Sequence, residues 1–328
     1  MAQANVVVLG GGSGGVVAAS HLGHALGSEH NVTLIDQRPA HVFQSSFLWM
    51  TIGRREPSEI TRDLTALGKR QVRFLNDRVT FIDTDRRVVQ TLHGAVPYDR
   101  LVVSLGFETH ADEIPGDHDA VHHAWEMDAA LRLRDALSRF DGGRIVVGIG
   151  GTPYRCPPGP YEMIWLIEDE LRRRGLRERT EIHFFTPEPG PVGGSGHPSE
   201  FIREHLARRD IALHTDFAIA DVNGRTKVIR AEDGRTLDFD LGIVIPPHRP
   251  SQVLYESGMV ESAGGIAIAD PDRLQTRWDG IYAIGDNADM PASKAGVVAH
   301  EEADVVAHNI AVGITGQGTP TRLRLHTI

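Results

Sequence analysis

The sequence predicts an α/β chain of two three-layer domains with parallel sheets. Strand-like and helix-like segments alternate, and one strand-turn-helix-strand unit occurs twice. The first unit has a strand, a helix and a second strand, at Asn5–Leu9, Gly14–Leu26 and Val32–Ile35. The second unit repeats this order, at Arg144–Ile149, Tyr161–Arg174 and Glu181–Phe185. A glycine-rich turn follows the first strand of each unit, which is the arrangement of a Rossmann-like domain.

Further segments fit the same alternation of strands and helices: Leu101–Leu105, Ser199–Arg209, Gly280–Ile284 and Ala295–Val312. A chain of 328 residues, 41% of them hydrophobic, is long enough for two ordinary cores. We expect the first domain to be discontinuous, with residues 1–107 and 245–328, and the second domain to occupy residues 108–244.

Composition narrows the classes of partner. A net charge of −10 without basic blocks argues against nucleic acid or an anionic membrane bound through charge. Cys156 is the only cysteine, which excludes an internal disulfide and a multi-cysteine zinc site. No apolar stretch approaches the roughly 20 residues that cross a bilayer, and no signal peptide precedes the first strand. We therefore expect a cytoplasmic protein whose membrane contact is at most peripheral.

The first glycine turn has the spacing of a dinucleotide-binding motif. Gly10 permits a tight turn, Gly12 lets a pyrophosphate approach the backbone, and Gly15 lets the following helix pack against the strand. Such a pattern is weak alone, but here it follows a strand and opens a helix. That context favours a bound dinucleotide over a glycine-rich turn without a ligand.

The residues around this turn are suited to the two ends of such a ligand. Ser13 and Gly14 begin the helix, whose free N–H groups and positive dipole end favour phosphates. Asp36 closes the second strand, where its carboxylate can accept hydrogen bonds from ribose hydroxyls.

The corresponding turn of the second unit has lost part of this pattern. Gly148 and Gly150 are in place, but Pro153 stands at the third position. The prolines that follow prevent a helix from starting directly at the turn. We therefore expect that this domain kept its fold and lost its nicotinamide site.

Cys156 lies in this proline-rich loop and has two interpretations. Lone cysteines are usually small buried hydrophobes. A polar, stiff loop next to Arg155 and just before a helix start instead favours an exposed, reactive thiolate. We favour the reactive thiol.

A third motif ends the strand at Gly280–Ile284. Gly285 and Asp286 follow it, and Asp286 can bind a polyol hydroxyl. Lys294 and the next helix start can stabilise negative charge on a reduced ring. A Gly-Asp pair after a strand is also a common turn, so the pattern alone leaves both interpretations open.

Together these motifs resemble those of the flavoprotein disulfide reductase superfamily, within it the sulfide:quinone oxidoreductase and flavocytochrome c sulfide dehydrogenase branch. The resemblance rests on residues 6–15, 98–106, 276–286 and, most specifically, 154–162. It implies FAD as the cofactor, bound by residues 1–107 and 245–328. Gln44-Ser45-Ser46 stands where covalent-flavin members have a cysteine, so the FAD is expected to be non-covalent.

The resemblance also implies roles for particular residues. Val79 contacts adenine through its backbone, and Lys294 lies at the pyrimidine edge of the flavin near the quinone pocket. Further FAD contacts are implied for the glycine turn and for these residues: Asp36, Gln37, Arg38, Ser104, Gly106, Gly285 and Asp286. Members of the branch use two redox cysteines, of which this chain has the counterpart of one, Cys156.

The sequence thus predicts an FAD-dependent oxidoreductase with Cys156 and Lys294 as its catalytic residues. Two electrons pass from sulfide or another small sulfur donor through flavin to a quinone or other acceptor. The alternatives are a single-subunit NADH:quinone dehydrogenase, or a non-catalytic flavin-binding redox partner or sensor. A homodimer is possible.

Overall fold

The computed structural model describes residues 3–325, which form two compact units. Within the described residues, unit 1 consists of 3–43, Thr61–Glu108 and 249–325, and unit 2 of Gln44–Ile60 and Thr109–His248. The expected division into residues 1–107 with 245–328 and 108–244 differs from these units chiefly at Gln44–Ile60. This segment, expected in the first domain, belongs to unit 2.

The segment joins unit 2 because its helix is apolar and packs there. Helix α2 (Phe47–Thr51) buries Phe47, Leu48 and Met50. It packs against helices α4 (Met127–Arg139) and α5 (Gly159–Arg173) of unit 2. Sequence periodicity did not reveal this, because five residues are too few to show a helical repeat.

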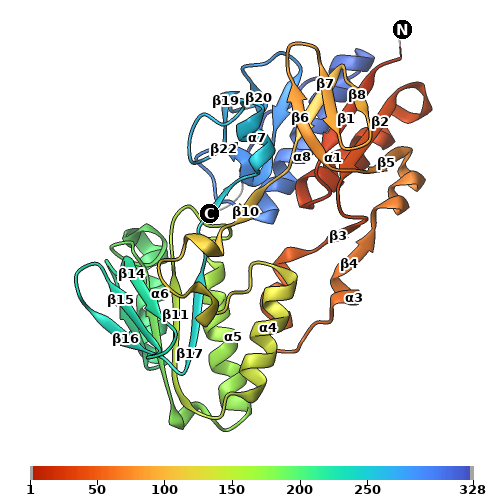
Figure 1. Ribbon diagram of the computed structural model, residues 1–328. Helices are drawn as coiled ribbons and strands as arrows, with labels where there is room; N and C mark the ends of the chain where they lie inside the picture. Colours follow the sequence, from red (N-terminus) through yellow and green to blue (C-terminus); the bar gives the residue numbers. More distant parts are fainter. Residues whose placement is uncertain (1–2, 326–328) are drawn as a thin grey trace. The chain divides into compact units, whose positions relative to one another are not determined.

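Unit 1 is built on a mixed, mainly parallel sheet in the order β22-β19-β20-β21-β9-β1-β2-β5. Figure 1 labels strands of this sheet, including β1, β2 and β5. Its strands are β1 Asn5–Leu9, β2 Asn31–Asp36, β5 Val72–Asn76, β9 Arg100–Val103, β19 Ile266–Asp270, β20 Gln275–Thr276, β21 Ile281–Ala283 and β22 Ala288–Asp289. Strand β1 pairs in parallel with β2 and β9, and β21 pairs in parallel with β9. The expected strand Leu101–Leu105 ends earlier, at Val103, because the chain turns at Ser104.

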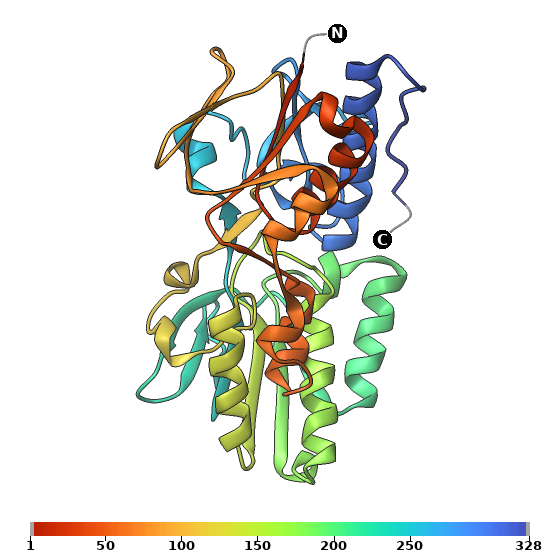
Figure 2. The same ribbon diagram turned by 90° about the vertical axis from the view of Figure 1, so that its right-hand side faces the viewer.

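Alternating side chains of these strands bury two different cores. Val6 and Val8 pack with helices α1 (Ser13–Leu26) and α8 (Gly296–Thr315) on one face of the sheet. Val7 and Leu9 face the other side. That side is covered by α7 and by a three-stranded antiparallel sheet (Figure 2). The covering elements are α7 Gln252–Glu256, β6 Val79–Asp83, β7 Val88–Thr91 and β8 Ala95–Pro97.

Unit 2 repeats this plan on a smaller parallel sheet in the order β13-β12-β11-β17. Its strands are β11 Gly143–Ile149, β12 Thr180–Phe185, β13 Ile211–His214 and β17 Leu241–Ile245. A second antiparallel sheet has strands β14 Ile219–Asn223, β15 Val228–Ala231 and β16 Thr236–Asp238. The helices are α4 Met127–Arg139, α5 Gly159–Arg173 and α6 Gly196–Arg208. Both units are therefore three-layered, which confirms the predicted fold class.

Neighbouring residues of β12 show how the unit 2 sheet faces both outer layers. The ring of Phe184 packs against Tyr161 of α5 on one face, with centroids 4.8 Å apart. The ring of Phe185 packs against Phe217 beside the antiparallel sheet, at 5.0 Å. Period-two alternation along the strand thus sends one aromatic side chain into each core.

The remaining elements are short. Strands β3 Ala40–Val42 and β4 Thr61–Asp63 pair antiparallel on either side of residues 44–60, and β10 Phe107–Thr109 pairs with β18 His248–Pro250. A further helix is α3 Pro57–Ile60. Short segments of 3-10 helix lie at Gly27–Glu29, Gln44–Ser46, Leu64–Arg70, Ala111–Glu113, His118–Ala120, Arg177–Arg179, Pro191–Gly194 and Gly285–Asn287.

Candidate functional site

The predicted FAD-binding segments of unit 1 gather at one edge of its sheet. Strands β1, β2, β9 and β21 run parallel, so their carboxyl ends share an edge. The glycine turn follows β1, Asp36 ends β2, Ser104 and Gly106 follow β9, and Gly285 follows β21. Open α/β sheets bind ligands at the carboxyl ends of their strands. The fold therefore brings together motifs that are far apart in the sequence.

The glycines of the first turn have separate reasons to lack a side chain. A β-carbon on Gly10, whose φ is +98°, would lie 2.2 Å from the carbonyl oxygen of Ser104. A β-carbon on Gly15 would lie 1.8 Å from the carbonyl oxygen of Gly10. One on Gly12 would meet no described atom within 4 Å. Gly12 thus presents an open backbone surface, which fits the close approach of a pyrophosphate.

The helix that follows this turn also fits an anionic ligand. Gly12 is the N-cap of α1, no side chain caps it, and the first turn contains no acidic residue. The N–H groups at an uncapped helix start are suited to phosphate oxygens. Ser104 is buried, with its Oγ 2.9 Å from the β-carbon position of Gly14. Ser104 therefore packs directly against the glycine turn.

Asp36 braces the glycine turn from β2. Its carboxylate accepts the N–H of Gly11 at 2.5 Å and that of Arg38 at 2.7 Å. Each carboxylate oxygen can accept more than one hydrogen bond, so capacity for ribose hydroxyls remains. Arg38 and Gln37 lie exposed beyond it. His41, which the sequence did not single out, places Nδ1 2.8 Å from the carbonyl oxygen of Gly11.

A buried carboxylate fixes the chain where Val79 begins β6. Asp77 donates its N–H to the carbonyl oxygen of Asp36 at 3.0 Å. Its carboxylate lies 3.0 Å from His93 Nδ1. Burial raises its pKa, but hydrogen bonds from Thr91, His93 and backbone N–H groups outweigh this and hold the pKa at about 2. Asp77 thus orients Val79, a role that no sequence motif indicated.

Two side chains missed by sequence reasoning hold the Gly285–Asp286 turn. Asn287 is fully buried, accepts the N–H of Gly106 at 2.8 Å and donates to the carbonyl oxygen of Val103 at 3.1 Å. Glu302 of α8 accepts the N–H of Gly285 at 2.6 Å. For Glu302, the available signal was a polar residue on the apolar face of a predicted helix.

The ammonium group of Lys294 bonds two backbone carbonyl groups of unit 1. Its Nζ donates to the carbonyl oxygens of Gly264 at 2.9 Å and Ala288 at 2.7 Å, and lies 5.0 Å from the centre of the Phe107 ring. Burial lowers its pKa, opposed by Asp286 and neighbouring acids. An ammonium group has three donors. One therefore remains for a ligand.

In unit 2, side chains pack on the glycines of the second turn. A β-carbon on Gly148 would lie 2.1 Å from the Phe185 ring, and one on Gly150 would lie 2.6 Å from Val244. Helix α5 begins only at Gly159, as the intervening prolines predict. The turn lacks the open glycine surface and adjoining helix start that unit 1 presents.

Cys156 lies in the loop before α5 and is partly exposed. Its φ is +56°, and its carbonyl oxygen accepts the N–H of Gly159 at 2.7 Å. Its Sγ lies 3.3 Å from the position of a β-carbon on Gly159, the first residue of α5. The sulfur is therefore beside a helix N-terminus, an environment that favours a thiolate.

Arg155 anchors this loop within unit 2. Its guanidinium donates to the side-chain oxygen of Gln44 at 2.6 Å and to the carbonyl oxygen of Trp125 at 2.7 Å. The Trp125 indole N–H returns a hydrogen bond to the carbonyl oxygen of Arg155 at 3.0 Å. The Cys156 loop is thus bonded to the segment 44–60 and to the chain before α4.

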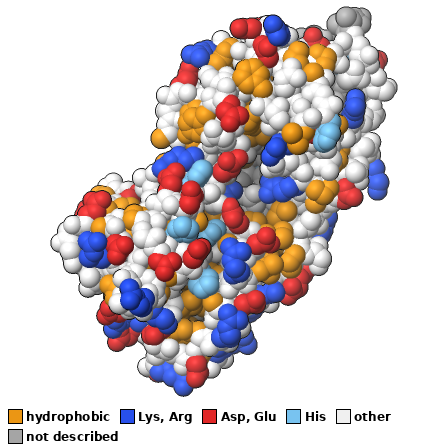
Figure 3. Space-filling view, viewed as in Figure 1, with side chains coloured by type: hydrophobic (Ala, Val, Ile, Leu, Met, Phe, Trp, Pro, Cys, Tyr) orange, Lys and Arg blue, Asp and Glu red, His pale blue; other side chains and the backbone are white. Residues whose placement is uncertain are grey.

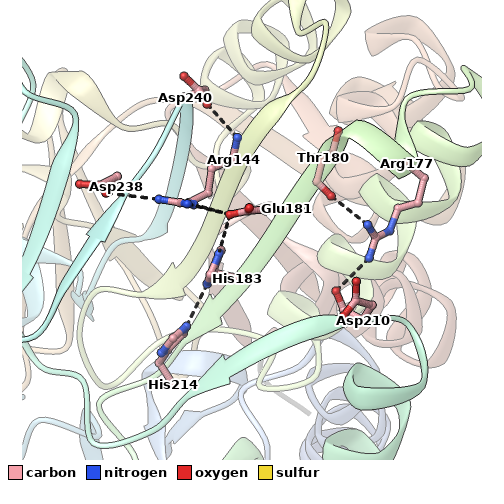
Figure 4. A network of polar contacts seen from close by, with 9 residues as sticks. All are labelled: Arg144, Arg177, Thr180, Glu181, His183, Asp210, His214, Asp238 and Asp240. Atoms are coloured by element: carbon pink, nitrogen blue, oxygen red, sulfur yellow. Dashed lines mark hydrogen bonds and ion pairs between the residues drawn. The ribbon is translucent and has the colours of Figure 1, made fainter.

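A separate polar network joins strands of the unit 2 sheet (Figure 4). Arg144 of β11 bonds Glu181 of β12 at 2.7 Å and Asp238 at 3.3 Å. His183 and His214 are 3.0 Å apart, and burial lowers the pKa of both. Within residues 3–325, no group of three or more His, Cys, Asp or Glu could hold a metal. The network therefore links β11, β12 and β13, from Arg144 near the amino end of the sheet to His214 at the end of β13.

Charges on the face drawn in Figure 3 are mixed, with acidic and basic side chains interspersed. In the part of the chain that the structure describes, none of the helices is both long enough and apolar enough to span a membrane.

The chain resembles known oxidoreductases in both sequence and structure. A family model of pyridine nucleotide-disulphide oxidoreductases matches residues 4–153 and 196–303. Another, of the central part of the flavocytochrome c sulfide dehydrogenase flavoprotein chain, matches residues 131–246. The mitochondrial sulfide:quinone oxidoreductase of Dictyostelium discoideum is 25% identical over 325 residues, covering 93% of this chain and 70% of that protein.

A type II NADH:quinone oxidoreductase of Staphylococcus haemolyticus is 24% identical over 335 residues, covering 95% of this chain and 83% of that protein. The X-ray structure of the Aquifex aeolicus sulfide:quinone oxidoreductase superposes with a TM-score of 0.83 and 24% identity. It covers 96% of this chain and 78% of that one, and shows the same fold.

The matched family consists of FAD-binding flavoproteins, which confirms the predicted cofactor and the predicted class of enzyme. The open glycine turn and uncapped helix of unit 1 fit such a cofactor. The chain is an FAD-dependent oxidoreductase and belongs to the pyridine nucleotide-disulphide oxidoreductase family.

Proposed function

We propose that this oxidoreductase transfers two electrons from sulfide, or another small sulfur donor, to a quinone. The observation that carries the proposal is Cys156, the only cysteine, on a partly exposed loop at the start of α5. This loop lies within the region matched by the sulfide dehydrogenase family model. The sulfide:quinone oxidoreductase relatives add support for both the donor and the acceptor.

We assign non-covalent FAD to the edge of the unit 1 sheet. The N–H groups of Ser13 and Gly14 would bind its pyrophosphate over the open surface of Gly12. Asp36 would accept ribose hydroxyls, with Gln37 and Arg38 beside it. The bound cofactor would supply two-electron redox chemistry.

The flavin end of the cofactor is assigned to the segments after β9 and β21. Asp286 would accept ribityl hydroxyls, and Gly106 would line the same edge. Lys294 would place its remaining N–H and its charge at the pyrimidine end. The backbone of Val79, held by Asp77, would contact adenine at the opposite end.

In the proposed reaction Cys156 carries the sulfur. The sulfur of HS⁻ bonds to the Cys156 thiolate and leaves a persulfide, one proton and two electrons. Bound FAD would supply the two-electron chemistry that links this oxidation to the quinone, which takes up two protons and becomes a quinol. An external thiolate then attacks the outer sulfur of the persulfide, which restores the Cys156 thiolate.

The second candidate is NADH:quinone oxidoreduction, favoured by the type II relatives. It needs a nicotinamide dinucleotide site in unit 2. The Phe185 ring against Gly148 and the late start of α5 at Gly159 disfavour such a site. Sulfide therefore ranks above NADH as the donor.

Anaerobic visible spectroscopy of the purified FAD protein decides between the donors. We expect sulfide to bleach the flavin, NADH to leave it oxidised and a soluble quinone to restore the colour after sulfide. Rapid bleaching by NADH but not by sulfide would reverse the ranking, and flavin that neither donor reduces would favour a non-catalytic role. A cytoplasmic or peripheral location and a homodimer stay predictions.

A further inference from the structure

Glu302 is a carboxylic acid in the apolar interior of unit 1. It lies on the buried face of α8, is 1% exposed, and is surrounded in the chain by buried Ala303 and Val305. Its Oε2 accepts the N–H of Gly285 at 2.6 Å. A buried carboxylate is costly to maintain unless a hydrogen bond or an opposite charge compensates for it.

Burial and the neighbouring charges together determine the pKa of Glu302. Burial raises its pKa to about 7, opposed by the Gly285 N–H and by the positive charge of Lys294. Asp286 and Glu301 act in the same direction as burial. Helix α1 packs on α8, and its titratable residues are His21 and His24. Both of these histidines are exposed. The carboxylate thus bonds the Gly285–Asp286 turn and also interacts with the charge of Lys294.

The hydrogen bond fixes one end of this turn. Gly285 has a φ of +71°, and a β-carbon there would lie 3.3 Å from Ala299 of α8, so the turn packs directly on the helix. Asn287 ties the other end to β9. Asp286 is held between these two anchors. Without Glu302, the partly buried N–H of Gly285 would lose its acceptor.

We propose that Glu302 is a positioning residue for FAD. By accepting the N–H of Gly285, Glu302 holds the Gly285–Asp286 turn in the position from which Asp286 contacts the cofactor. The inference rests on the proposed placement of FAD at Asp286. What matters is the position of the acceptor oxygen. The carboxylate is therefore replaceable by an amide of the same length but not by a shorter acid.

Two substitutions separate these properties. Glu302→Gln keeps an oxygen acceptor at the same distance and removes the charge. Glu302→Asp keeps the charge and withdraws the acceptor by one methylene group. Asp304→Asn removes an acid from the outer face of the same helix and serves as the matched control. FAD affinity is measured by titrating each apo-protein with FAD and following flavin fluorescence, after its thermal unfolding has shown that it is folded.

We expect Glu302→Gln and Asp304→Asn to bind FAD within about threefold of the wild type. Glu302→Asp should bind FAD about tenfold or more weakly, as expected when the partly buried Gly285 N–H loses its acceptor. Wild-type affinity in Glu302→Asp, or an equal loss in Glu302→Gln, would overturn the proposal. If Glu302→Asp does not fold, Glu302→Met, which keeps the volume and lacks the acceptor, replaces it with the same two outcomes.

The titration needs no electron donor, so a failure of sulfide oxidation leaves this test intact. Asp286→Asn is titrated in parallel. If its FAD affinity equals that of the wild type, the placement of FAD at this turn is wrong and the role of Glu302 falls with it.

Discussion

A β-carbon on Gly15 would lie 1.8 Å from the carbonyl oxygen of Gly10, whereas one on Gly12 would meet no described atom within 4 Å. These two glycines of one motif therefore lack a side chain for different reasons. Gly15 allows α1 to pack against β1, and Gly12 leaves space for a ligand.

Substitutions at these two positions should separate folding from FAD binding. Gly15→Ala should destabilise unit 1 by several kcal/mol, since backbone rather than a flexible side chain blocks the β-carbon. Gly12→Ala should leave the apo-protein folded and weaken FAD binding by about tenfold or more, as its methyl group occupies ligand space. Thermal unfolding and FAD titration of the apo-proteins provide the check. Equal effects of the two variants on stability would contradict this division.

The parts of the fold that follow periodic patterns could be predicted. The strands of the two repeated units and helices α1, α5 and α8 lie within a few residues of their expected bounds. The glycine turn, Asp36 and Gly285 lie at one sheet edge, because parallel strands end together. Those relationships follow from local sequence and from the rules of parallel sheets.

Features that depend on tertiary packing could not be predicted. The segment Gln44–Ile60 joins unit 2 through buried side chains of a five-residue helix. Asn287 and Glu302 act through hydrogen bonds to backbone groups distant in sequence. Single polar residues of this kind leave no periodic signal, since their meaning depends on the backbone that they meet in the folded chain.

Glu302 should make stability depend on pH. Its folded pKa, raised by burial to about 7, exceeds the ordinary value of 4.5. Stability linked to its protonation is therefore fully present below about pH 4.5 and is lost as pH rises through about 7. As pH rises across this window, the free energy of unfolding of the wild type should fall relative to that of Glu302→Gln, by up to about 3 kcal/mol.

Denaturant unfolding of the apo-proteins between pH 5 and 8 measures this difference. Glu200→Gln, which removes an exposed acid on α6, should show no such trend with pH. A constant difference between Glu302→Gln and the wild type would show that Glu302 does not titrate in this range.

Lys294 should raise the reduction potential of the bound flavin, because a nearby positive charge favours a reduced, anionic ring. In Lys294→Met we expect the potential to fall by about 30 mV or more, a tenfold change in the two-electron equilibrium. Lys294→Arg, which retains the charge, should fall less. Anaerobic titration against a redox dye measures both. An unchanged potential in Lys294→Met would restrict Lys294 to its bonds with Gly264 and Ala288.

The central claim is that Cys156 accepts sulfur while FAD accepts the electrons. Its most direct test is the anaerobic rate of flavin bleaching by sulfide in the wild type and in Cys156→Ala, with dithionite reducing both as the control. The account predicts that the sulfide rate falls by about 100-fold or more in Cys156→Ala, as expected on removal of a nucleophile, while the oxidised FAD spectrum is unchanged. Full sulfide-dependent bleaching in Cys156→Ala would contradict it.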